Sequence, residues 1–177
     1  MAKVLGLGHV GIYVRDIDRM ERFYKDFLGL TVTKRDATGT SVFFSAKPAE
    51  VDHEIAIMAG RPADENPKLI QQLSLRVESL DDVRQFYRRA KAEGYKIQRT
   101  VSHASAVGCY MYDPEGNVIE TFWPTGKDSW AVTAEHVDLD ESDDAILAKV
   151  EDHWQRTRDV PMGGVPRAEQ AVRILGS

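Results

Sequence analysis

The sequence predicts an α+β fold in which two paired βαβββ modules form an open sheet cavity and a helical C-terminal tail follows. Three observations predict this class: apolar residues that alternate as in strands, helical stripes that follow them, and a return of the same order further along. His9 aligns with Gln72, and Asp18 with Asp81, at the same offset of 63 residues. Two copies of one unit that each leave a sheet face uncovered are expected to pack as a pair around a shared cavity.

Length and composition are consistent with this organisation. The chain has 177 residues, of which 42% are hydrophobic, and can bury one proper core. We assign residues 1–63 to a first module, 64–126 to a second and 127–177 to a C-terminal helical extension, with the two modules together forming one domain. A polar, proline-bearing linker is expected over residues 61–67.

The first module begins with alternating residues over 5–14, which predict a strand whose mixed face carries His9. A helix follows, capped by Asp16 or Asp18 and ended by Gly29 in the left-handed conformation. Three more strands are expected, over residues 30–34, 41–45 and 53–58.

The second module repeats this order. Residues 69–77 alternate as a strand, and Ser79 with Asp82 resembles a capping box at the start of a helix that Gly94 ends. Strands are then expected over residues 96–100, 107–112 and 118–123.

The C-terminal extension differs in kind from the modules. Residues 142–158 predict a helix with an acidic start, and Pro166 is placed to open a short last helix through Leu175. The apolar positions of the extension must cover either the module pair or a partner subunit, and the sequence leaves both alternatives open.

Charge and composition exclude several classes of function. A formal net charge of −5 and a pI near 5.5 argue against a surface for nucleic acid or for an anionic membrane. The apolar runs are too short to span a bilayer. The single cysteine, Cys109, permits no internal disulfide and alternates away from Tyr110, so it is expected to be buried. We therefore expect a cytoplasmic protein.

Three polar residues occupy cavity-facing positions on three predicted strands: His9, Gln72 and Glu120. An imidazole nitrogen, an amide oxygen and a carboxylate oxygen form a credible ligand set for a divalent metal and leave positions open for substrate. Taken singly, each residue is explained as well by a polar position in a wet cavity. The agreement of all three with the repeat favours the metal site.

Further candidates lie near this set. His53 is a candidate acid–base group if it faces the cavity, whereas Glu54, which aligns with Glu120 at an offset of 66, becomes a fourth metal ligand if it faces inward. Tyr110 is expected either to hydrogen-bond at the metal or to be an ordinary core tyrosine. His103 is either a polar contact at the cavity mouth or an exposed loop histidine.

Two stretches carry a resemblance to known proteins: Gly8-His9-Val10-Gly11-Ile12 and Asp113-Pro114-Glu115-Gly116-Asn117-Val118-Ile119-Glu120. With the paired units they resemble the vicinal oxygen chelate superfamily, which includes glyoxalase I, bleomycin- and fosfomycin-resistance proteins and the extradiol catechol dioxygenases. The resemblance covers residues 3–124. It marks the superfamily better than any one activity.

Within this superfamily the sequence is most similar to the extradiol ring-cleaving dioxygenases. The resemblance implies that His9 and Glu120 are the first and third iron ligands and that His53 is the acid–base residue. It also implies that Tyr110 stands beside the metal. His103 lies about two residues from the position of the family's second active-site histidine.

The second ligand position departs from the family, because Gln72 stands where the dioxygenases have a histidine. Some glyoxalases use a glutamine at the pseudo-equivalent position. The resemblance implies Fe(II) as the metal. Because an amide oxygen is a weaker and harder donor than imidazole, Mn(II) or another divalent metal is the alternative.

The resulting hypothesis is a metal-dependent extradiol-type dioxygenase that cleaves a catechol-like aromatic diol with O₂. The expected partners are the small aromatic diol and a second copy of the chain in a homodimer, with no nucleic acid and no membrane. One alternative is a glyoxalase- or epimerase-like lyase or isomerase in which Glu54 completes the ligand set. The other is a non-enzymatic drug-binding resistance protein.

Overall fold

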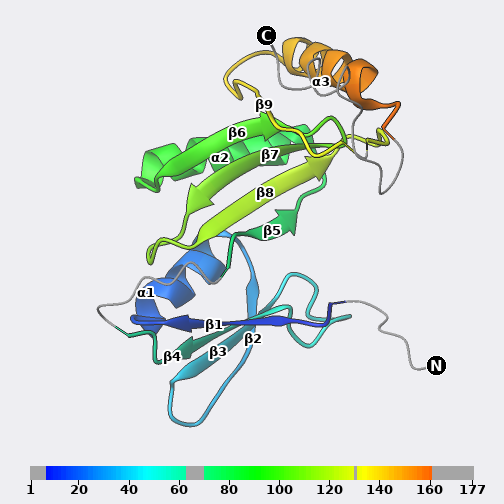
Figure 1. The fold of residues 1–177 in the computed structure, drawn as a ribbon. Helices are drawn as coiled ribbons and strands as arrows, with labels where there is room; N and C mark the ends of the chain where they lie inside the picture. The colour runs from blue at the N-terminus through cyan, green and yellow to red at the C-terminus, as the bar shows by residue number, and fades with distance from the viewer. Residues whose placement is uncertain (1–6, 63–69, 130, 161–177) are drawn as a thin grey trace, which may run out of the picture. The chain divides into compact units, whose positions relative to one another are not determined.

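The computed structural model describes residues 7–62, 70–129 and 131–160. The chain divides into two compact units, Met1–Leu69 with Asp113–Gly116, and Ile70–Tyr112 with Asn117–Ser177. A four-stranded sheet, a five-stranded sheet and their helices confirm the predicted α+β class (Figure 1). The assignment of both modules to one domain stays a prediction, and the predicted last helix from Pro166 lies outside the described residues.

The first unit holds a four-stranded sheet in the order β1-β4-β3-β2. β1 runs parallel to β4, and the other neighbouring strands are antiparallel. Ile12 and Val14 of β1 are buried whereas Gly11 and Tyr13 are exposed, which confirms the predicted alternation. The strands are β1 (Val10–Val14), β2 (Thr31–Arg35), β3 (Ser41–Ser45) and β4 (Ile55–Ala59).

The helix after β1 has two segments, α1 (Ile17–Arg22) and a π-helical turn, η1 (Phe23–Phe27). Asp16 is the cap that the structure uses, because its side chain accepts from the backbone N–H of Arg19 at 2.9 Å. Gly29 follows the helix with a φ of 76°, as predicted. The π-helical turn was not predicted; it keeps the aromatic side chains of this segment buried, namely Phe23, Tyr24 and Phe27.

The turn Asp113–Gly116 belongs to the first unit through Glu115. Glu115 Oε1 accepts from the backbone N–H groups of Arg15 at 2.6 Å and Asp16 at 2.9 Å. Arg61 Nη1 lies 3.6 Å from the other oxygen, Oε2. A carboxylate beside the start of α1 is favourable, because the first N–H groups of a helix carry partial positive charge.

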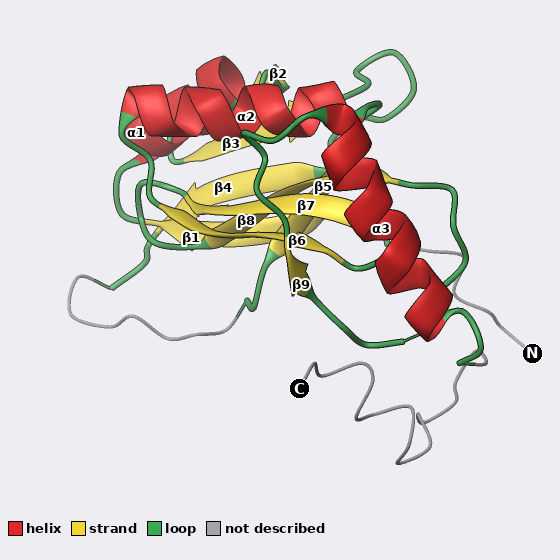
Figure 2. Cartoon of the chain, turned by 90° about the horizontal axis from the view of Figure 1, so that it is seen from above, coloured by secondary structure: helices red, strands yellow, loops and turns green. Residues whose placement is uncertain are grey.

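The second unit repeats the βαβββ order. Its sheet runs β5-β8-β7-β6-β9, with β5 parallel to β8 as β1 is to β4 (Figure 1). The helix α2 (Leu80–Glu93) packs on β7 and β8 across one face of this sheet (Figure 2). It begins at the predicted capping box of Ser79 and Asp82, and Gly94 ends it with a φ of 77°. The strands are β5 (Leu73–Arg76), β6 (Ile97–Ser102), β7 (Ala106–Tyr112), β8 (Val118–Pro124) and β9 (Glu135–His136).

The C-terminal extension packs on the sheet of its own unit. β9, which was not predicted, is antiparallel to β6 and pairs His136 with Val101. α3 (Asp143–Thr157) is capped by Ser142 and confirms the predicted helix; it contacts β6 and buries Ile146 and Val150. Within the described part of the chain, no helix has the length and apolar content needed to cross a membrane.

Candidate functional site

Glu120 is the centre of a polar cluster in the second unit. It lies on β8, opposite Ser74 on β5 and Tyr110 on β7, and only 5% of its surface is exposed. Its Oε2 accepts from Gln72 Nε2 at 3.0 Å and from the Ser74 hydroxyl. Two of the predicted metal ligands, Gln72 and Glu120, are therefore in direct contact.

Gly108 makes room for this carboxylate. A Cβ atom at Gly108 would lie 2.5 Å from Glu120 Oε1, closer than any real Cβ contact. Neither Gly108 nor Ser74 was named as a site residue from the sequence. The sequence does contain a signal for both. Gly108 lies two residues before Tyr110, and Ser74 lies two residues after Gln72, so each is expected on the same sheet face as a predicted site residue.

Tyr110 and His103 extend the cluster along the sheet. The Tyr110 hydroxyl lies 3.0 Å from His103 Nε2, and the Arg99 guanidinium stands 4.3 Å from the centre of the tyrosine ring. Burial raises the pKa of Tyr110 to about 12, and a hydrogen bond with Glu120 adds to the rise. Tyr110 therefore keeps its proton at neutral pH; it lies next to the predicted ligand Glu120, and His103 contacts Tyr110.

His9 and His53 form a separate pair in the first unit. Their ring centres are 4.4 Å apart, and the Phe43 ring meets His53 edge-on at 5.0 Å. His53 Nδ1 lies 2.7 Å from Asp52 Oδ2. Hydrogen bonds from Lys34 and then from His53 lower the pKa of Asp52, so this carboxylate stays ionised beside the imidazole.

The Glu54 side chain hydrogen-bonds the backbone. Its Oε2 accepts from the backbone N–H of Ala46 at 2.7 Å, and both Glu54 and His53 precede β4 rather than lying within it. The strand register also corrects the alignment of Glu54 with Glu120. Gly11 pairs with Ala56, while its counterpart Ser74 pairs with Glu120, so Ala56 occupies the position equivalent to Glu120.

Cys109 and His153 are both buried. Cys109 is buried, as expected, and burial raises the pKa of its thiol to about 12, which makes it a poor nucleophile. His153, to which the sequence assigned no role, is fully buried in α3 between Ser102 and Thr133. Its position in the helical stripe was the only signal for its burial.

The surroundings of the Glu120 carboxylate are suited to a divalent cation. Among the residues that the structure describes, the hydrogen-bond partners of Glu120 are neutral and no lysine, arginine or histidine forms an ion pair with it. A buried carboxylate without a cation is costly, and its oxygens are suitable ligands for divalent metals. No group of three or more His, Cys, Asp and Glu side chains in the described residues is placed to hold a metal.

Comparison with known proteins now identifies the family. The family model described as the Glyoxalase/Bleomycin resistance protein/Dioxygenase superfamily matches residues 6–121. The chain belongs to this superfamily. Its members generally depend on a divalent metal, bind small molecules and are commonly oligomeric. β9 and α3 of the extension lie beyond the matched residues.

Individual relatives are distant. The 2,2',3-trihydroxybiphenyl dioxygenase of Sphingomonas paucimobilis is 26% identical over 121 residues, which cover 66% of this chain and 40% of that enzyme. The chain therefore matches less than half the length of this superfamily member.

Solved structures show the same fold. Lactoylglutathione lyase from Agrobacterium tumefaciens matches with a TM-score of 0.54 and 19% identity, over 69% of this chain and 96% of that one. The fosfomycin resistance protein FosX from Mesorhizobium loti matches with a TM-score of 0.53 and 20% identity, over 70% of this chain and 96% of that one.

Proposed function

We propose that this superfamily member is a metal-dependent dioxygenase of the extradiol type, which cleaves a catechol-like aromatic diol with O₂. The observation that carries the proposal is the buried Glu120 carboxylate, which has only neutral donors among the described residues and lies beside the Tyr110–His103 pair. The 26% identity to a trihydroxybiphenyl dioxygenase supports the reaction class.

The ligands of the proposed metal are Gln72 and Glu120 of the second unit and His9 of the first. The contact between Gln72 and Glu120 supports the first two, and His9 stays a prediction from the sequence. Fe(II) is the proposed metal, with Mn(II) as the alternative. When bound, it supplies the Lewis acidity that brings the diol and O₂ into reaction.

His53 is the proposed acid–base residue. The ionised Asp52 carboxylate accepts from His53 Nδ1–H, which fixes the tautomer in which Nε2 is the basic nitrogen. His53 Nε2 is then the atom that takes a proton from a hydroxyl of the diol. Since His53, rather than Glu54, lies against His9, the first unit favours the dioxygenase over a lyase that needs Glu54 as a ligand.

Tyr110 and His103 are proposed to orient the reactants. The high pKa of Tyr110 keeps its hydroxyl protonated, so it has one proton, which it can donate to Glu120, to an oxygen atom of a reactant or to His103 Nε2. His103 Nε2, at 3.0 Å, holds the direction of that hydroxyl.

An assay on catechols tests the proposal. Protein purified without air is loaded with Fe(II), mixed with a panel of catechols in the presence of O₂, and followed for the yellow ring-fission product. We expect turnover by the wild type, loss of turnover in Glu120→Gln and near-normal turnover in Glu54→Gln. Metal binding by the wild type without any ring-fission product, together with loss of metal binding in Glu54→Gln, would favour the lyase, and ligand binding without any metal requirement would favour a drug-binding protein.

A further inference from the structure

A residue of the C-terminal extension hydrogen-bonds the His103 ring. Its Nδ1 hydrogen-bonds the backbone carbonyl oxygen of Thr133, a residue that precedes β9. A carbonyl oxygen can only accept, so Nδ1 carries the proton. In neutral His103 the other nitrogen, Nε2, is then the acceptor that faces the Tyr110 hydroxyl at 3.0 Å.

Thr133 is held in turn by His153. The Thr133 hydroxyl lies 2.7 Å from His153 Nε2, and the opposite ring nitrogen, Nδ1, lies 3.1 Å from the Ser102 hydroxyl. Ser102 precedes His103 in the chain. The His153 imidazole therefore bridges the two segments that flank His103, one on β6 and one in the extension.

The His153 side chain has no solvent exposure and stays neutral. Burial is the largest cause lowering its pKa, and the Glu135 carboxylate, whose Oε1 is 3.7 Å from His153 Nε2, opposes that shift. A neutral imidazole has one donor and one acceptor nitrogen, which suits two hydroxyl partners, Ser102 and Thr133.

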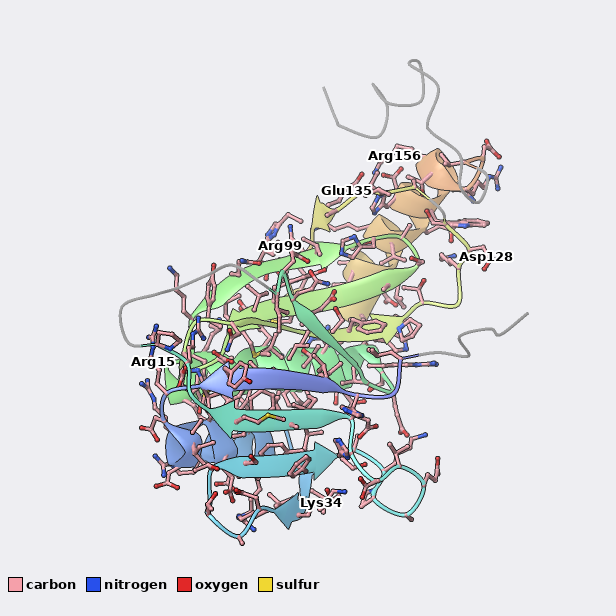
Figure 3. All side chains as sticks on the ribbon, turned by 60° about the horizontal axis from the view of Figure 1, so that its bottom comes forward. Arg15, Lys34, Arg99, Asp128, Glu135 and Arg156 are labelled. Carbon is pink, nitrogen blue, oxygen red and sulfur yellow. The ribbon has the colours of Figure 1, made fainter. Side chains whose placement is uncertain are left out.

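Polar contacts fix α3 against the rest of the unit. Arg156 forms a two-pronged ion pair with Glu135 of β9, at 2.6 and 2.7 Å, and the labelled side chains point toward one another (Figure 3). Trp154 Nε1 donates to the Asp128 carbonyl oxygen at 2.8 Å. His153 directly precedes Trp154 and lies one turn before Arg156, so these two anchors hold its part of α3 in place.

From this chain of contacts we propose that Thr133 and His153 are positioning residues. They hold His103 in its Nδ1–H tautomer, so that Nε2 accepts the single proton of the Tyr110 hydroxyl in competition with Glu120. The catalytic consequence rests on the proposed function, whereas the tautomer itself does not. Because the extension lies beyond the matched residues 6–121, this device is an addition of this chain to the part that it shares with the superfamily model.

The test is the tautomer of His103, measured on metal-free protein by long-range ¹H–¹⁵N correlation of labelled histidines at neutral pH. His103→Gln assigns the resonances. We expect the Nδ1–H form in the wild type, a clear shift of both nitrogen resonances toward the opposite tautomer in His153→Ala, and a smaller shift in His153→Gln. Thr133→Val, which has nearly the same shape, removes only the hydroxyl contact and is expected to resemble His153→Ala.

Val150→Ala is the matched control, since it also opens space in the buried face of α3 but contacts neither His103 nor Thr133 through a hydrogen bond. It is expected to lower stability and leave the tautomer unchanged. The proposal is overturned if Thr133→Val and His153→Ala leave the tautomer as in the wild type, or if Val150→Ala shifts it equally.

Activity gives a second, separate measurement. In the Fe(II)-loaded enzyme we expect His153→Gln to lower kcat about tenfold with KM within about twofold, because oriented acid–base and hydrogen-bonding groups contribute at that scale or above. If no catechol is turned over at all, the proposed function fails, while the tautomer measurement still decides the role of the extension.

Discussion

The two units share one topology and place different ionisable side chains on it. In the first, His9 and His53 meet ring to ring beside the ionised Asp52, and Ala56 stands at the position equivalent to Glu120. In the second, a buried carboxylate lies among neutral donors. One copy of the repeat therefore carries a pair of imidazoles and the other a buried carboxylate, so duplication of a fold need not duplicate its polar side chains.

The largest effect is expected at Glu120. Glu120→Ala should lower Fe(II) affinity by at least about 100-fold, which exceeds the roughly 10–100-fold cost of losing an outer-shell partner of a metal site. Glu54→Ala in the first unit should change it by less than about twofold, because its carboxylate serves the Ala46 backbone. Titration with Fe(II) under anaerobic conditions measures both, and equal losses would contradict the division between the units.

The next effect separates two glycines. Gly108→Ala should destabilise the fold by about 1–3 kcal/mol and displace the Glu120 carboxylate, because the new Cβ would lie 2.5 Å from Oε1. Gly11→Ala meets only the flexible end of Met58 at 3.5 Å and should stabilise by about 0.4–1 kcal/mol. Urea unfolding compares them, and a neutral Gly108→Ala would show that the carboxylate is free to move.

Replacing Gln72 by the histidine found at the equivalent position of the first unit tests its role as a metal ligand. Gln72→His places an imidazole where the first unit has His9, and should raise Fe(II) affinity about tenfold because imidazole is the better donor for that ion. Gln72→Leu, of similar size but without a donor atom, is the control and should weaken binding. Competition with a metal-binding dye measures the change, and no difference between the two variants would remove Gln72 from the ligand set.

The smallest effect concerns pH. The pKa of His153 is lowered in the folded state. The stability contributed by its neutral form is therefore fully present above the unfolded pKa of about 6.5. It is lost as the pH falls through the lower folded pKa. The stability advantage of the wild type over His153→Gln should therefore shrink between pH 7 and pH 5. Urea unfolding at each pH measures it, and a constant difference would mean that burial does not perturb His153.

The sequence was sufficient for the features that depend on local periodicity and capping. The repeat, the capping box at Ser79 and the end of the helix at Gly94 all follow from spacing along single strands and helices. The alignment of Glu54 with Glu120 failed because strand register is set by pairing, and a shift of two residues preserves the same alternation.

Features that depend on distant packing escaped prediction. β9 has only two residues, too few to show a period, and the π-helical turn keeps the helical pattern of apolar residues. The contacts of His153 with Ser102 and Thr133 join residues 51 and 20 positions apart, which no local pattern records. The same holds for Gly108, whose role appears only when the opposite strand is in place.

The proposed function depends on Glu120 as an anchor for a divalent metal. Metal analysis of wild-type and Glu120→Ala protein, both purified without air, tests it most directly. We expect about one equivalent of iron or manganese per chain in the wild type and almost none in the variant. A wild type that carries no metal and gains none from added Fe(II) or Mn(II) would contradict it.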